Sequence, residues 1–300
     1  MRDQMPNPPA RKPARAPRTR PRSTLPDEDA AAPGAVPPEE RSIARQIDAL
    51  TDPSFMTSFA RGLAVVRAFG DARRTMTIAQ ISTQTGIPRA AVRRCLHTLK
   101  QLGYADAEMN NFSLRPKILG LGYAYLSSTP LSLSAQPCLD DITRRLHESC
   151  SLAVLDDDQV LYIARSATSR VMSVALNPGS RLPAYCTSLG RVLLAGLPEI
   201  DCERYLARTR LQAMTPHTIT TQKRLREILA GVREAGHAVV EEELEIGLRS
   251  IAVPVRGASG SVVAALNVGA QAGRVPRRQM EEQFLPLLRE GADELAVLLP

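Results

Sequence analysis

The first residues that could do chemistry are basic and share one side of a short predicted helix. At helical spacing, this side carries Arg89, Ala90, Arg93, Arg94, His97 and Lys100. The other side is apolar, and we expect it to be buried: Val92, Cys95, Leu96, Leu99 and Leu102. Arginines near a helix N-terminus, beside a small alanine, suit contacts in the DNA major groove. A solvated basic surface is the plainer explanation, so further signals are needed.

Those signals lie on both sides of this helix. Thr77 followed by Gln80 is a capping box that starts a preceding helix, and Gly86 with Pro88 separates the two helices. An earlier helix is indicated by apolar residues spaced from Phe55 to Phe69. Two short strands, 104–107 and 112–114, flank a turn signal at Asn110–Asn111.

Three helices followed by a hairpin predict a winged helix-turn-helix. We therefore expect Thr77 at a helix start, and Asn111 and Arg115 at the wing, to contact DNA together with the basic helix. Lys117, just beyond the wing, is a further candidate for phosphate contact.

Length and composition set the frame for this domain. The chain has 300 residues, 44% hydrophobic and 23% charged, which is enough for two ordinary domains. Residues 1–26 contain seven Lys or Arg and one Asp, so they carry +6 of the net charge of +7. We expect a disordered basic, Pro-rich tail (1–52), the DNA-binding domain (53–116), a linker helix and hinge (117–131) and a second domain (132–300). The linker helix itself is predicted over 118–128.

The cellular location and the lack of a cofactor are predicted from signals that the sequence does not contain. It has neither a long apolar run nor a secretory signal, so we expect a cytoplasmic protein without a membrane partner. The five cysteines are scattered, odd in number and without a C-x-x-C pair: Cys95, Cys138, Cys150, Cys186 and Cys202. This pattern favours a reducing compartment over disulfides or zinc. No cofactor or metal is expected.

The second domain alternates strand and helix signals. Strands are predicted over 151–155, 160–164, 171–176, 250–255 and 262–268. Helices are predicted over 132–148, 189–196, 201–207, 222–235 and from Pro276 onward. Hairpins with helices between them indicate an α+β fold, an antiparallel sheet packed by helices.

A small-anion site is predicted where the apolar helix near residue 189 begins. A helix N-terminus offers free N–H groups and positive potential, and hydroxyl and guanidinium groups would add donors. The candidates at this end are Arg181, Tyr185, Thr187, Ser188 and Leu189. Arg191 could also pair a carboxylate. Glu241, Arg249 and Ser250 are candidates for the facing wall. Thr187 and Ser188 are equally well explained as helix caps.

Two other classes of function remain open. A thiol enzyme would use Cys186, but His217 and His237 are not at a telling spacing, so no catalytic residue is assigned. A non-specific DNA-packaging protein would depend on the basic tail.

Five long segments resemble the IclR family of bacterial transcription regulators. They are TSFARGLAVVRAF, GIPRAAVRRCLHTLKQLGY, FSLRPKILGLGYAYLSSTPLSLSAQPCLD, GSRLPAYCTSLGRVLLA and ELEIGLRSIAVPVR. They are most similar to the PcaR/PobR/PcaU-like subgroup, which controls aromatic-acid catabolism. The resemblance runs from about Phe55 to the C-terminus and spans both expected domains.

The resemblance implies a dimer or tetramer that binds a double-stranded DNA operator. It implies a GAF-like C-terminal domain that binds a small carboxylic acid such as protocatechuate, 4-hydroxybenzoate or β-ketoadipate. The subgroup consists mainly of activators, which would engage RNA polymerase, and a repressor of another small-acid pathway is the alternative. One departure concerns Val240, where the family often has an acidic residue and where Glu241 would have to substitute.

Overall fold

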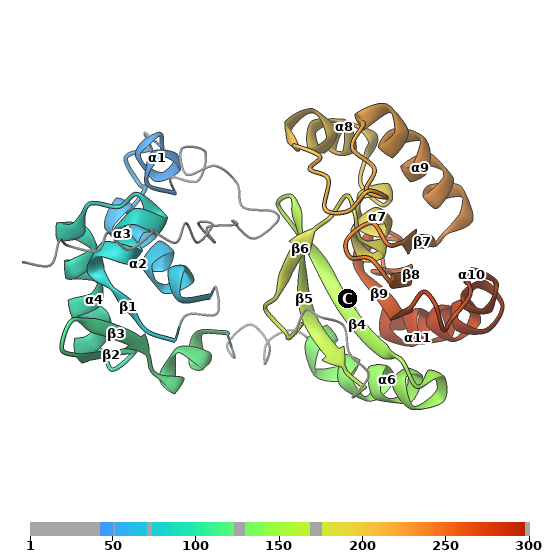
Figure 1. The fold of residues 1–300 in the computed structure, drawn as a ribbon, viewed down its shortest axis with the longest axis horizontal. Helices are drawn as coiled ribbons and strands as arrows, with labels where there is room; N and C mark the ends of the chain where they lie inside the picture. The colour runs from blue at the N-terminus through green and yellow to red at the C-terminus, as the bar shows by residue number, and fades with distance from the viewer. Residues whose placement is uncertain (1–42, 51, 71–73, 123–129, 169–175, 298–300) are drawn as a thin grey trace, which may run out of the picture. The chain divides into compact units, whose positions relative to one another are not determined.

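The computed structural model describes residues 43–50, 52–70, 74–122, 130–168 and 176–297 (Figure 1). The expected tail up to residue 42 lies outside these ranges, as do residues 123–129 of the expected linker and 171–175 of an expected strand. Residues 119–122, at the start of the expected linker helix, are helical.

The described N-terminal part combines helices with a small sheet. The helices are α1 (Ile43–Asp48), α2 (Thr57–Arg67), α3 (Ile78–Thr85) and α4 (Arg89–Gln101). The strands β1 (Met76–Thr77), β2 (Ala105–Glu108) and β3 (Asn111–Leu114) form an antiparallel sheet in the order β1-β3-β2. Short 3-10 turns follow α2 (Ala68–Gly70) and β3 (Pro116–Ile118). This is the expected winged helix-turn-helix.

Two boundaries differ from expectation. Helix α1 lies inside the segment expected to be tail, because Ala44 and Ile47 are buried in the same core as Val65 of α2. The hairpin turn is Met109–Asn110, since Glu108 pairs with Asn111 in the ladder. Met109 adopts the left-handed region with φ of 52°.

Local chemistry explains the spacing of α3 and α4. The Thr77 side chain accepts a hydrogen bond from Gln80 N–H, and the Gln80 side chain accepts one from Thr77 N–H. This is the expected capping box. Gly86 ends α3 with φ of 72°, a conformation that costs glycine little. Pro88 is the N-cap residue of α4, one position before the helix.

The C-terminal part is built on six antiparallel strands. Their order is β6 (Arg181–Pro183), β5 (Gln159–Ser166), β4 (Ser149–Asp156), β9 (Val262–Gln271), β8 (Leu248–Arg256) and β7 (Ala238–Glu241). Strand β6 was not foreseen in the sequence. No strand was predicted at these residues, which pair with Gln159–Leu161.

Helices cover both faces of this sheet (Figure 1). One core contains α6 (Pro130–Leu146) and α11 (Leu285–Val297), which follows α10 (Arg277–Gln279) and a π turn (Met280–Phe284). The other core contains α7 (Ser188–Ala195), α8 (Glu199–Arg208) and α9 (Gln222–Ala235). The expected α+β class is therefore confirmed. No helix in the described part is long and apolar enough to cross a membrane.

Helix α7 lies very close to its own approach segment. All eight of its residues are buried. A Cβ atom on Gly190 would lie 2.1 Å from the carbonyl oxygen of Ala184, so only glycine fits there. The start of α7 is thus held firmly against the chain that leads into it.

Candidate functional site

The basic face of α4 is open to solvent. Its members are all exposed: Arg89, Ala90, Arg93, Arg94, His97 and Lys100. Among the described residues, none of these cations forms an ion pair. Exposed arginines of the C-terminal part behave differently, because Arg204, Arg226 and Arg278 each pair with a nearby carboxylate. Unpaired cations gathered on one helix face are what phosphate and base contacts require.

Arg94 differs from its neighbours because it borders an apolar groove between α2 and α4. The groove is lined mainly by large hydrophobic side chains that remain exposed: Met56, Phe59, Leu63, Leu102 and Leu121. Leu102 was expected to be buried, but it is 54% exposed. Arg89, Arg93, His97 and Lys100 do not line the groove.

The other candidate DNA contacts take distinct positions. Thr77 already uses its hydroxyl in the capping box. Asn111 and Arg115 are exposed at the two ends of β3. Lys117 instead donates a 2.8 Å hydrogen bond to the carbonyl of Leu102 at the end of α4. Lys117 therefore caps the helix rather than projecting toward DNA.

A pocket lies in the C-terminal part, between the sheet and the start of α7, and we call it the inner pocket. Its polar lining is Ser149, Ser151, Arg165, Thr187, Ser188, Glu243, Ser250 and Asn267. Its apolar lining is Tyr162, Leu176, Leu182, Cys186, Val240, Leu244 and Leu248, with Gly269 between strands. It encloses about 480 Å³, its mouth included.

The sheet supplies a polar row at the inner pocket. Arg165 pairs with Ser151, and Ser151 pairs on its other side with Asn267. One step along the strands, Ser149 and Ser250 both pair with Gly269. Partners in register share a face of the sheet, so polar groups from four strands meet beneath α7.

Arg165 is the outstanding group of this row. Its Nη1 donates a 3.0 Å hydrogen bond to Ser151 Oγ, and its Nε is buried without a partner. Among the described residues, no carboxylate forms an ion pair with it. Desolvation lowers the pKa of the Arg165 guanidinium. A desolvated cation without a counter-ion is a ready site for an anionic ligand.

The start of α7 faces the same pocket. Thr187 is the N-cap residue: its Oγ1 accepts a hydrogen bond from Gly190 N–H and donates to the Pro183 carbonyl. Ser188 is buried, and its Oγ has no hydrogen-bond partner among the described residues. Asn267 Oδ1 is likewise buried and unpartnered. Thr187 therefore holds the helix start, while Ser188 and Asn267 remain free to bind a ligand.

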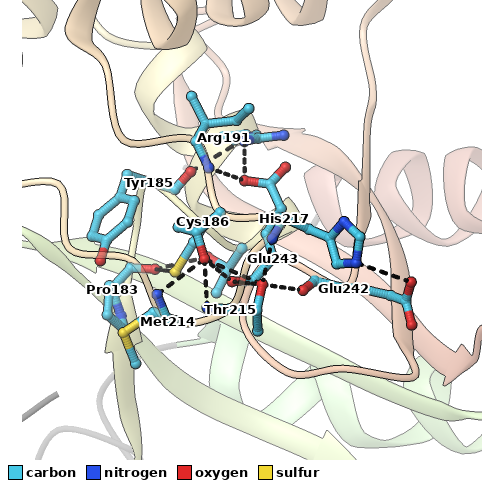
Figure 2. Close-up of polar contacts among 12 residues, drawn as sticks. Pro183, Tyr185, Cys186, Arg191, Met214, Thr215, His217, Glu242 and Glu243 are labelled. Atoms are coloured by element: carbon cyan, nitrogen blue, oxygen red, sulfur yellow. Dashed lines mark hydrogen bonds and ion pairs between the residues drawn. The ribbon is translucent and has the colours of Figure 1, made fainter. Parts of the chain in front are cut away.

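The wall opposite the sheet is fixed by a buried ion pair (Figure 2). Arg191 donates a 2.6 Å hydrogen bond to Glu243 Oε2 and another to the Tyr185 carbonyl. The backbone N–H of Ile219 donates to the same Glu243 oxygen, and Thr218 donates to the Glu243 carbonyl. Arg191 is thus committed to the protein's own carboxylate, and it ties the loop at Glu243 to α7.

Several predicted ligand contacts do not line the inner pocket. Arg181 pairs with Asp156, and Arg249 pairs with Glu241 at 2.5 Å and also donates to the Ala272 carbonyl. Tyr185 is buried with its hydroxyl on the Gln212 carbonyl. Leu189 is buried in the core under α7. Of the predicted set, the structure brings together Thr187, Ser188 and Ser250.

The sequence interpretation missed the residues that the sheet contributes: Ser149, Ser151, Arg165 and Asn267. Each lies in a strand, where the face of the sheet to which its side chain points depends on the register of the strands. Cys186 lines the pocket, but burial raises the pKa of its thiol to about 12, which disfavours a thiolate nucleophile. His217 lies 3.9 Å from Glu242 instead. Among the described residues, no cluster of His, Cys, Asp or Glu could hold a metal ion.

Both parts of the chain match a known protein family. Residues 58–108 match the IclR helix-turn-helix domain, and residues 123–297 match the bacterial transcriptional regulator IclR C-terminal domain. The Pca regulon regulatory protein of Pseudomonas putida is 55% identical over 86% of this chain and 90% of its own length. The p-hydroxybenzoate hydroxylase transcriptional activator of Acinetobacter baylyi is 39% identical over 82% of this chain and 92% of its own.

Solved structures give the same result. A transcriptional regulator from Rhodococcus is 43% identical, with a TM-score of 0.72 over 82% of this chain and 98% of its own. An IclR homologue from Microbacterium hydrocarbonoxydans, solved with 4-hydroxybenzoate, is 27% identical with a TM-score of 0.69 over 81% and 98%. With matches that cover both the winged helix and the pocket domain, the chain belongs to the IclR family of bacterial transcriptional regulators.

Proposed function

We propose that this chain regulates transcription of genes for aromatic-acid catabolism, and that a small carboxylic acid in the inner pocket controls it. The names of the P. putida and A. baylyi relatives support the pathway. The 4-hydroxybenzoate complex of the Microbacterium homologue supports an acid as the effector. Protocatechuate, 4-hydroxybenzoate and β-ketoadipate are the candidate acids.

One observation carries the assignment of the effector site. Arg165 lies in the pocket without a carboxylate partner, beside the unpartnered polar atoms of Ser188 and Asn267. An acid would supply the missing counter-ion to Arg165 and accept from the Ser188 hydroxyl. Thr187 and Ser250 complete the predicted residues of this site, with Ser149 and Ser151 added from the sheet.

The basic face of α4 would read the operator DNA. Arg89, Arg93 and His97 project from the side of α4 that is clear of the apolar groove, so we assign base and phosphate contacts to them first. Asn111 and Arg115 would contact the backbone from the wing. The acid must bind two DNA-relevant states unequally, because equal affinity shifts no equilibrium.

Self-association completes the proposal. Phe59 and Met56 are 64% and 68% exposed in the groove, which is unusual for side chains so large. Helix-turn-helix regulators read two half-sites as pairs. A second copy of this surface, related by a twofold axis, would cover the apolar side chains while leaving the basic side of α4 free. Phe59→Ser should weaken the dimer in analytical ultracentrifugation.

The name of the A. baylyi relative, which is that of an activator, supports one direction of regulation. We therefore propose activation, with contact to RNA polymerase, in the cytoplasm where the chromosome lies. Transcription in vitro with purified polymerase distinguishes the outcomes. Acid-dependent stimulation supports activation, and acid-relieved inhibition would replace it with repression.

The central test combines ligand and DNA binding. The three candidate acids are screened by thermal shift, because a ligand that binds the native state raises the melting temperature. In parallel, the protein selects its operator from a pool of randomised DNA. We expect one acid to raise the melting temperature and to change affinity for the selected DNA. The proposal fails if no acid binds and no sequence is enriched.

A further inference from the structure

The inner pocket is lined by residues that are buried or half-buried. None of its sixteen lining residues is exposed. Eleven of them are buried, and the other five are half-buried. A neighbouring space with exposed lining residues would give an effector a route toward Arg165.

A second, outer cavity lies at the ends of strands β4, β8 and β9. It shares Ser149, Leu248 and Gly269 with the inner pocket, so the two spaces meet at these three residues. The outer cavity is wider, about 1080 Å³ with its open mouth, and five of its lining residues are exposed: Ile246, Gly247, Gln271, Gly273 and Arg274. The outer cavity is therefore the more exposed of the two spaces.

The outer cavity contains three charged side chains. Arg274 forms an ion pair with Glu148, and the two residues extend from the adjoining ends of β9 and β4. The Glu148 side chain is 4% exposed and that of Arg274 is 39% exposed, so the cation faces solvent while the carboxylate does not. Glu245 also lines the cavity. The only outward cation on this route therefore belongs to Arg274, within the described part of the chain.

We propose that the outer cavity is the access chamber of the effector pocket, and that Arg274 draws the carboxylate of an incoming acid toward Arg165. This proposal rests on the proposed function, because the ligand that enters is the effector acid. A cation at the mouth of a cleft raises the association rate of an anion and has little effect on its dissociation once bound. Glu148 and Glu245 oppose this attraction, and Glu148 also holds the Arg274 side chain in place.

The proposal makes predictions of opposite sign for the two members of one ion pair. With 4-hydroxybenzoate as the probe, Arg274→Gln should lower the association rate constant about threefold at low salt, and Glu148→Gln should raise it. Glu245→Gln should also raise it. All three effects should shrink as salt increases, because exposed charges are screened. A purely structural ion pair would give single variants that both lower the melting temperature and shift the rate in the same direction.

A matched control is available in the same C-terminal part. Arg278 is 84% exposed, pairs with Glu282 and lies outside both cavities. Arg278→Gln removes the same charge and should leave the association rate unchanged. An equal effect of Arg274→Gln and Arg278→Gln would show that only net charge matters and would overturn the proposal.

A second experiment measures access to the inner pocket without depending on acid binding. Cys186 lines the inner pocket, so its modification by methanethiosulfonate reagents reports passage through the chamber. Arg274→Gln should slow labelling of Cys186 by an anionic reagent and speed labelling by a cationic one, as counted by peptide mass spectrometry. Glu148→Gln should do the reverse. Unchanged labelling rates would overturn the access route, whereas a lack of acid binding alone would count only against the proposed function.

Discussion

Arg165 on β5 donates a 3.0 Å hydrogen bond to Oγ of Ser151, the residue that pairs with it on β4. The bond fixes the guanidinium while its Nε stays buried and unpartnered. A cation that is held and desolvated before the ligand arrives loses little freedom on binding. Because of this preorganisation, we expect Arg165 to be the strongest single determinant of acid affinity in the pocket.

Arg165→Gln should therefore weaken binding of the effector acid. Charge-assisted hydrogen bonds contribute about 1.5–3 kcal/mol, which corresponds to roughly a 10- to 150-fold loss of affinity. Isothermal titration calorimetry measures this directly. Arg181→Gln is the matched control, because Arg181 pairs with Asp156 outside the pocket. Equal losses in both variants would remove Arg165 from the site.

Arg93→Ala should weaken specific DNA binding. A base-contacting arginine contributes about 1–3 kcal/mol, and its loss relaxes specificity at one position of the operator. Fluorescence anisotropy with selected and scrambled DNA separates the specific from the non-specific part. Lys117→Ala provides the contrast: it should lower stability by removing a cap on α4 while leaving specificity intact. Full retention of specificity in Arg93→Ala would contradict its role as a reader.

The buried pair of Arg191 and Glu243 should be costly to break from one side. Arg191→Met leaves the Glu243 carboxylate buried without its cation, a loss of about 3–5 kcal/mol. The double variant Arg191→Met with Glu243→Leu should recover most of that stability, because neither side then buries an unpaired charge. Urea denaturation followed by circular dichroism provides the comparison. A double variant as unstable as the single one would show that packing, not charge, fixes this wall.

Alkaline pH should destabilise the C-terminal part. Burial raises the pKa of the Cys138 and Cys186 thiols to about 12, above the ordinary value of 9.0. A raised pKa means that the folded state favours the neutral thiol, so this contribution is complete below pH 9 and declines between pH 9 and 12. The urea midpoint should fall from pH 8 to pH 10.5, and less steeply in Cys186→Ala. An equally steep fall in that variant would assign the effect to other groups.

Local signals in the sequence predicted much of the fold. The capping box at Thr77 and Gln80 appears as expected, and α9 occupies Gln222–Ala235 as its apolar spacing and Gly236 indicated. Both features depend on residues within a few positions of each other. Such short-range rules hold whatever the rest of the chain does.

The facing of Arg165 could not be predicted in this way. Alternation along a strand places residues three apart on opposite faces, so Tyr162 and Arg165 would point to different sides of the sheet. The ladder with β4 is irregular, however: Ala164 pairs with Leu152, and Tyr162 pairs with Ala153. This bulge at Ile163 turns both Tyr162 and Arg165 into the pocket. No signal in the local sequence predicts this bulge.

The misassigned arginines have a related cause. Arg181 and Arg249 stand near turns and hydroxyl-rich segments, which is where anion sites are common. Asp156 ends β4, two strands away from Arg181 on β6, and Glu241 pairs in register with Arg249 on the adjoining strand. Whether an arginine is free depends on which carboxylate the sheet brings beside it, and this information is non-local.

The unpaired cations of α4 also set a conflict between folding and binding. Residues 43–118 contain eleven Lys or Arg against five acidic residues, a net charge of +6 on a small domain. Like charges repel in the free protein, so added salt stabilises this domain by screening them. The same salt lowers the affinity of the domain for DNA, because cations compete with the protein for the phosphates. Operator DNA would thus supply the negative charge that neutralises this domain. A higher ionic strength should stabilise the free domain and weaken its complex with DNA.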